Sequence, residues 1–235
     1  MTVNINKVIK EQLSGYFDGD EKFIVAVSGG PDSQCLLKAF THVVGKDRCL
    51  AVGIDHGLRA SANDELSIAE ELATKVGVNF ERIKVQVKKG PSVMAQAREA
   101  RYSALFKRAG EFGTRFVVTG HNFDDQAETA LIQMMRGQQM RQMKSIAPSQ
   151  FSVPLNDGEP TFQCSTGMIF RPMLKIPRKD ILGYLKRWGV PFAEDPSNSN
   201  PKYLRSWIRK ELLPMMEEKS PQIRQFLNRL SECKY

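Results

Sequence analysis

An apolar run that breaks abruptly into a glycine-rich loop sets the strongest limit on the architecture. The run FIVAV spans residues 23–27, the loop SGGPDS spans residues 28–33, and a helical pattern continues to about Val44. Glycines allow the backbone to turn sharply and to approach a ligand closely. A helix that begins directly after such a loop offers unpaired N–H groups and the positive end of its dipole to a phosphate. The stretch therefore predicts a strand, a phosphate-binding turn and a helix, although it lacks the GK[ST] of a Walker A loop.

The same alternation of apolar runs and amphipathic stretches continues along the chain. Further strands are expected at 50–55, 80–87 and 115–120, and further helices at 61–78, 92–113 and 123–137. Regular alternation of this kind predicts an α/β fold, with a parallel sheet covered by helices on both faces. Because such sheets bind ligands beyond the carboxyl ends of their strands, the loops that follow strands are the places to look for a site.

Two more loops after expected strands carry reactive side chains. The first, residues 55–59, places an acid, an imidazole and a guanidinium at a strand end. A lone histidine such as His56 more often has a structural role. In the second, residues 119–129, Asp125 and Glu128 lie three positions apart and so share one helix face. Acids at a helix start also serve as caps, but this pattern is typical of a Mg²⁺ or amine site.

Positive charge is concentrated in one part of the chain. The protein has a net charge of +8, and residues 171–210 alone hold ten Lys and Arg and three Asp and Glu, a net charge of +7. A localised basic patch attracts polyanions such as nucleic acid, while a solvated basic surface is the alternative reading. Within this segment Lys202, Arg205 and Arg209 recur at helical spacing opposite an apolar stripe. That basic stripe is expected to contact RNA phosphates or to complete a nucleotide site.

Cysteine spacing and the absence of long apolar runs indicate a protein of the cytoplasm. The four cysteines lie far apart and form no CxxC pair, which favours reduced thiols over a zinc ribbon or a disulfide framework. No run approaches the length of a membrane span, and residues 1–22 are polar and mixed in charge, unlike a signal peptide.

Together the three loops resemble a known family. SGGPDS matches the SGGxDS PP-loop of the N-type ATP pyrophosphatases, and the rest of the chain is similar to the catalytic domain of the tRNA(Ile)-lysidine synthetases. The matching stretches are IDHGLR, QAREARYSALF, GHNFDDQAETALIQMMRG, FRPML and DPSNSNPKYLRSWIRKELLP. The resemblance runs from about residue 23 to residue 214. It implies a Rossmann-like three-layer sandwich of the adenine nucleotide alpha hydrolase type, with residues 1–214 as the catalytic domain and 215–235 as a C-terminal helical tail.

The resemblance also implies an activity. Such enzymes use ATP, with Mg²⁺, to adenylate C2 of the wobble cytidine in the tRNA(Ile) that carries the CAU anticodon. The amine of L-lysine then displaces AMP and leaves the modified base lysidine. The metal would neutralise charge on the pyrophosphate leaving group.

Site residues are carried over position by position. The nucleotide is expected to contact the three loops at Ser28, Gly29, Gly30, Pro31, Asp32, Ser33, Ile54, His56, Gly120 and His121. Asp32 is expected to lie near Mg²⁺, and Asp125 and Glu128 to hold the lysine ammonium and assist in its deprotonation. Arg98 or Arg101 would bind phosphate or the substrate base, with the choice left open. Contacts with RNA are expected at Arg171, Lys202, Arg205 and Arg209.

Two departures from the family keep alternatives open. The family usually has a glycine-rich loop after the RG dipeptide, whereas no glycine occurs here from 138 to 157. The chain also ends at Tyr235, before the C-terminal domains of many members. A minimal enzyme, a fragment and an enzyme with another substrate therefore stay as alternatives. A homodimer is a further alternative. A related PP-loop enzyme with another acceptor is one alternative. A non-catalytic tRNA-binding paralogue is the other, but the presence of Asp32, Asp125 and Glu128 favours an enzyme.

Overall fold

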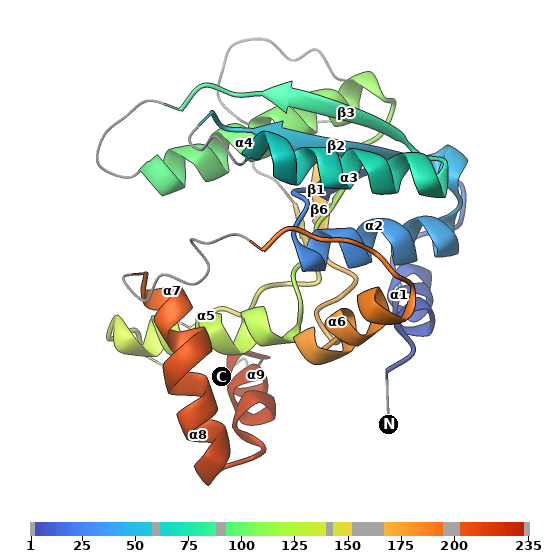
Figure 1. Cartoon of the computed structure of the whole chain (residues 1–235). Helices are drawn as coiled ribbons and strands as arrows, with labels where there is room; N and C mark the ends of the chain where they lie inside the picture. Colours follow the sequence, from blue (N-terminus) through green and yellow to red (C-terminus); the bar gives the residue numbers. More distant parts are fainter. Residues whose placement is uncertain are drawn as a thin grey trace.

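The computed structural model describes residues 3–57, 62–87, 93–139, 143–151, 167–194 and 203–232. Within these ranges a sheet has the strand order β3-β2-β1-β4-β6-β5 (Figure 1). The strands are β1 (Phe23–Val27), β2 (Cys49–Asp55), β3 (Asn79–Lys84), β4 (Phe116–Val118), β5 (Ser149–Phe151) and β6 (Met168–Phe170). All neighbours pair in parallel except β5 and β6. The expected α/β fold with a parallel sheet is confirmed, with one antiparallel edge strand, a common addition to such sheets.

Helices cover both faces of this sheet. Their bounds are α1 (Ile5–Ser14), α2 (Pro31–Val44), α3 (Ala62–Val76), α4 (Val93–Glu111), α5 (Phe123–Met135), α6 (Arg178–Arg187), α7 (Leu204–Trp207), α8 (Leu213–Lys219) and α9 (Ile223–Glu232). Helices α1, α2, α3 and α6 share one apolar core with the sheet, and α4 packs on the opposite face against Ile24, Leu50 and Val117. The result is the expected three-layer sandwich. In the part of the chain that is described, no helix combines the length and the apolar character that crossing a membrane requires.

The C-terminal helices form a smaller core with α5. Ala127 and Leu131 of α5 pack against Ile208, Leu213 and Leu227, so the helices coloured red lie beside α5 and away from β3 (Figure 1). Helices α7 and α8 are joined by a π-helical segment, Ile208–Leu212. Pro214 explains this segment, because proline has no N–H to continue the α-helical hydrogen-bond pattern. The described part of this helical region begins at Leu204.

The order of the strands determines where the site lies. Strand β1 sits between β2 and β4, so the chain turns to opposite sides of the sheet after β1 and after β4. Ligands in α/β sheets bind in the crevice at such a switch point. A Cβ at Gly120 would lie 3.0 Å from the carbonyl oxygen of Asp32, so the loop after β4 packs directly against the start of α2. Loops 28–33 and 119–122 therefore meet at one edge of the sheet.

Gly29 is required by both its conformation and its surroundings. Its φ is +78°, and a Cβ there would lie 2.0 Å from the carbonyl oxygen of Glu65 in α3. We expect Gly29→Ala to lower the free energy of unfolding by roughly 2–4 kcal/mol, from backbone strain and overpacking together. The matched control is Gly30→Ala, whose Cβ would make an ordinary 3.7 Å contact with Ser28 Oγ. Urea unfolding of both variants tests this, and equal stabilities would contradict it.

Candidate active site

The loop after β1 forms an open cradle at the start of α2. Gly30 is the N-cap residue and supplies no side-chain cap, so the N–H groups of the first turn remain available to a ligand. Ser33 Oγ accepts a hydrogen bond from Ser28 N at 3.1 Å and donates one to Gly30 O at 2.9 Å. The Ser33 hydroxyl therefore holds the loop in shape, and the exposed Ser28 is the serine that faces solvent.

Asp32 lies in the first turn of α2 and faces the loop after β4. Its Oδ2 accepts a hydrogen bond from Arg178 Nη1 at 2.8 Å. Oδ1 of Asp32 and Nδ2 of Asn122 are both buried without a hydrogen bond of normal length, although the Asn122 amide is near enough to favour the ionised carboxylate. Burial raises the pKa of Asp32 to about 6, against the opposing charge of Arg178. Asp32 therefore has one oxygen paired with Arg178 and one buried oxygen without a hydrogen bond of normal length.

Helix α5 begins with a capping box that orients the acid pair. Asn122 Oδ1 accepts hydrogen bonds from the backbone N–H groups of Asp124 and Asp125, and Asp125 Oδ2 accepts one from Asn122 N at 2.9 Å. This reciprocal arrangement stabilises the first turn. It uses one oxygen of Asp125, so Oδ1 is the atom that faces the site.

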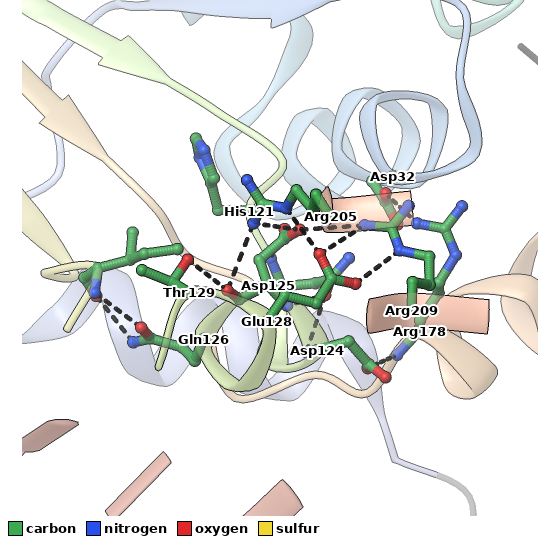
Figure 2. A network of polar contacts seen from close by, with 12 residues as sticks. Asp32, His121, Asp124, Asp125, Gln126, Glu128, Thr129, Arg178, Arg205 and Arg209 are labelled. Atoms are coloured by element: carbon green, nitrogen blue, oxygen red, sulfur yellow. Dashed lines mark hydrogen bonds and ion pairs between the residues drawn. The ribbon is translucent and has the colours of Figure 1, made fainter. Parts of the chain in front are cut away.

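Glu128, one turn further along α5, is held by two arginines. Its side chain is 0% exposed. Arg205 Nε donates to Oε2 at 2.7 Å, and Arg209 Nε donates to Oε1 at 2.6 Å, with a second bond from Arg209 Nη2 to Oε2 at 2.9 Å. Burial alone would lower the pKa of Arg209, but the hydrogen bonds and charge of Glu128 raise it. Figure 2 shows the two guanidinium groups converging on Asp125 and Glu128.

Asp124 links α5 to two helices that come much later in the sequence. Its Oδ2 accepts a hydrogen bond from Arg178 N at 2.7 Å, at the start of α6. Its Oδ1 pairs with Arg224 of α9, which also forms a two-point ion pair with Glu217 of α8. Asp124 thereby positions Arg178 for its contact with Asp32. Pairs of this kind, partly buried and with charge-assisted hydrogen bonds, are stronger than surface ion pairs.

A group of cations surrounds His121 beside the acid pair. Burial, then Arg171, Arg98 and Arg101, lower the pKa of His121 to about 3, so the imidazole is neutral. Its Nδ1 shares a 2.9 Å hydrogen bond with the hydroxyl of Thr119. The guanidinium groups of Arg98 and Arg101 lie 5.0 and 5.2 Å from the centre of the Tyr102 ring. The two arginines expected to bind phosphate or base therefore lie on the His121 side of the crevice.

Arg171 was expected to contact RNA, and the structure corrects this. The residue is 2% exposed, and its guanidinium donates to Ala147 O at 2.8 Å and to Gln150 Oε1 at 3.0 Å. Buried in this way, it cannot reach a phosphate at the surface. Directly after β6, it instead adds positive charge near His121. The sequence showed a basic residue here but not its burial, because burial depends on how β5 and β6 pack.

The other expected positions fall into three groups. Gly29, Gly30 and Pro31 form the turn at the start of α2, and Gly120 packs against it. Ile54 and His56 lie at the carboxyl end of β2, the strand beside β1. Lys202 lies outside the described residues. Arg178 and Arg224 were missed as site residues; no local pattern marks them, since their partners lie 146 and 100 positions away.

The side chains around the start of α2 have the chemistry to hold a nucleotide together with Mg²⁺. Mg²⁺ is commonly held by one or two carboxylates together with substrate phosphates and water. Asp32 offers one carboxylate beside a phosphate cradle, and its Oδ1 has no hydrogen bond of normal length. Among the described residues no group of three or more His, Cys, Asp or Glu could hold a metal ion without such help. The residues present therefore fit a metal that arrives with the phosphates.

Sequence comparison supports the resemblance over most of the chain. The model of the PP-loop domain family matches residues 1–216. The chain is 32% identical over 215 residues to the tRNA(Ile)-lysidine synthase of Burkholderia mallei, covering 91% of this chain and 42% of that protein. It is 31% identical to the tRNA(Ile)-lysidine synthase of Thermus thermophilus, covering 91% of this chain and 39% of that protein. The chain thus spans less than half the length of these curated relatives.

Structural comparison supports the fold. A U34-tRNA thiolase of Methanococcus maripaludis has a TM-score of 0.74 at 15% identity, covering 97% of this chain and 77% of that one. An NH₃-dependent NAD synthetase of Campylobacter jejuni has a TM-score of 0.51 at 13% identity, covering 98% and 91%. At such low sequence identity, these structural similarities support the fold alone.

Proposed function

Because this chain belongs to the PP-loop domain family, we propose that it binds ATP at the loop after β1 and uses it to convert the wobble cytidine of tRNA(Ile) to lysidine. The observation that carries the proposal is the convergence of a phosphate cradle, Asp32 and the Asp125–Glu128 pair on one crevice. The identity with curated tRNA(Ile)-lysidine synthases over about nine-tenths of the chain supports it.

In the first step, the chain's own residues position the nucleotide. The open N–H groups at the start of α2 bind the pyrophosphate part, and Asp32 would hold Mg²⁺, which would supply charge neutralisation for the leaving pyrophosphate. Ile54 and His56, at the end of β2, lie where the adenine and ribose extend. The cations around His121 face the α-phosphate or the cytidine, and the neutral imidazole adds no further positive charge there.

In the second step, Asp125 and Glu128 hold the ammonium of L-lysine against the activated C2 of the base. Only the neutral amine attacks, so one carboxylate accepts a proton as the C–N bond forms and AMP leaves. Asp125 Oδ1 is suited to this role, because the other oxygen of that carboxylate is already used in the cap. Positioning the amine in this way removes much of the entropic cost of the reaction.

The basic segment contributes to RNA binding through side chains that face solvent. Arg205 and Arg209 are turned towards carboxylates, whereas other basic residues of the segment are exposed, among them Lys175, Lys179, Lys186 and Arg187. We expect replacement of these four by Ala to reduce the salt dependence of tRNA binding, by roughly 0.7–0.9 in the log–log slope for each phosphate that the variant no longer neutralises. Filter binding across a range of salt concentrations measures this slope.

The matched control removes the same number of exposed charges elsewhere: Lys7, Lys10, Lys22 and Lys107. A similar reduction of the slope in the control would show that total charge, and not this segment, determines the affinity.

Base analysis of modified RNA tests the proposed function directly. Unmodified tRNA(Ile) with the CAU anticodon is incubated with the protein, ATP, Mg²⁺ and labelled L-lysine, then digested to nucleosides. Label recovered in a lysine-substituted cytidine is the expected result. ATP binding without any label in the RNA would point to a PP-loop enzyme with another acceptor.

A further inference from the structure

The acid pair already has its counter-charges. Asp125 and Glu128 carry two negative charges, and the guanidinium groups of Arg205 and Arg209 lie against them, within 3.5 Å at every contact. Oδ2 of Asp125 is also occupied, by the backbone N–H of Asn122. A further cation would enter a site whose charge is balanced. If a substrate ammonium is to use these carboxylates, one guanidinium must move away, since a third positive charge is unfavourable at this distance.

The two arginines are held very differently. Arg209 lies on the π-helical segment, and its side chain is 23% exposed. Its Nε and Nη2 donate hydrogen bonds to the two carboxylate oxygens of Glu128, at 2.6 and 2.9 Å. Arg205 is 44% exposed and makes one short bond, from Nε to Glu128 at 2.7 Å. Its other contacts, to Oδ1 and the carbonyl oxygen of Asp125, are long, at 3.3 and 3.4 Å. Arg205 is therefore the guanidinium that can leave at the smaller cost.

We propose that Arg205 is a removable counter-ion that closes the amine site in the free protein, and that a phosphate of bound RNA or ATP draws it away to admit lysine. This inference rests on the proposed function of Asp125 and Glu128. Guanidinium binds phosphate with the same two-point geometry that it uses for carboxylate, so the exchange replaces one charge-assisted contact by another. Arg205 is the second residue of the four-residue helix α7 and reaches solvent, where a polyanion can meet it.

The consequence is an order of binding. Lysine is admitted only after a phosphate-bearing substrate, RNA or ATP, has arrived. Arg205 acts as a positioning and selectivity residue through the acid pair. Its effect is therefore expected on the affinity for lysine and on the coupling between substrates.

Equilibrium dialysis of labelled L-lysine tests the proposal. The wild-type chain is expected to bind lysine about tenfold more tightly when a CAU anticodon stem-loop, or an ATP analogue that cannot be cleaved between the α- and β-phosphates, is present. Separate additions of RNA and analogue identify which phosphate source displaces Arg205. In Arg205→Gln, lysine is expected to bind tightly without either addition, and the coupling should disappear.

Two further variants make the result interpretable. Lys219→Ala removes one exposed charge from α8 and is expected to behave as wild type. Arg205→Lys keeps the charge but lacks the planar fork, and is expected to retain part of the coupling. Circular dichroism of each variant verifies folding, and if Arg205→Gln does not fold, the reduced coupling of Arg205→Lys takes its place.

The outcomes separate this inference from the proposed function. Equal lysine affinity of the wild type with and without phosphate-bearing substrates would overturn the role of Arg205. Weaker binding in Arg205→Gln would overturn it too, because Arg205 would then be part of the lysine site. Absence of lysine binding under every condition, with RNA-dependent pyrophosphate release intact, would overturn the assignment of the acid pair to the amine and the inference with it.

Discussion

Asp32→Ala is expected to reduce pyrophosphate release from ATP by about a thousandfold or more, while the chain remains folded. The carboxylate lies in the first turn of the helix that follows the phosphate cradle, and its Oδ1 has no hydrogen bond of normal length. Without it, nothing in the cradle holds the metal that neutralises the leaving group. A coupled assay for pyrophosphate measures the loss. Asp64→Ala is the matched control, since it removes an acid from the first turn of α3 instead.

Stability and activity are expected to change in opposite directions at this position. Burial raises the pKa of Asp32 from 3.8 to about 6, so the folded state disfavours the ionised carboxylate. The contribution of Asp32 to the free energy of unfolding is therefore greatest below 3.8, the pKa of the unfolded chain. That contribution is lost as the pH rises through about 6, the pKa in the folded chain. Asp32→Asn should raise the melting temperature near neutral pH, and the gain should shrink as the pH is lowered towards 4. Unchanged pyrophosphate release in either variant would remove Asp32 from the mechanism.

Asp125→Asn is expected to reduce lysine incorporation at least about a hundredfold, while adenylate formation falls much less. The amide keeps an oxygen for the capping hydrogen bond to Asn122 but cannot accept the amine proton. Transfer of label from α-labelled ATP to RNA reports adenylate formation, and labelled lysine reports the second step. Glu218→Gln, an exposed change on α8, serves as the control.

Glu128→Gln should show the same division between the half-reactions, but with a loss of stability. Its carboxylate is fully buried under Arg205 and Arg209, and neutralising one member of a buried ion pair typically costs about 3–5 kcal/mol. The comparison must therefore be made at a temperature where both variants are folded. Equal loss of both half-reactions in Asp125→Asn and Glu128→Gln would indicate a metal role for the acid pair.

The fold was predictable because its signals are local. Alternating apolar runs and amphipathic stretches identified β1 to β4 and the helices α2 to α5, and their regular order required a parallel sheet. Turn chemistry predicted a phosphate-binding loop at 28–33, since glycines let the backbone turn sharply and approach a ligand where a helix begins. The sequence also placed Asp125 and Glu128 on one face of a helix, which the structure bears out.

What only the tertiary structure decided is the pairing of charges. The sequence alone established the PP-loop, the parallel sheet and a concentration of arginines between 171 and 210, but a count of charges says nothing about what each one faces. Arg178 meets Asp32 across 146 positions, and Arg205 and Arg209 meet Glu128 across 77 and 81. These contacts exist because α6 packs on α2 and the C-terminal helices pack on α5 through an apolar core. Burial then turns nearby opposite charges into specific ion pairs, since carboxylates removed from water require partners.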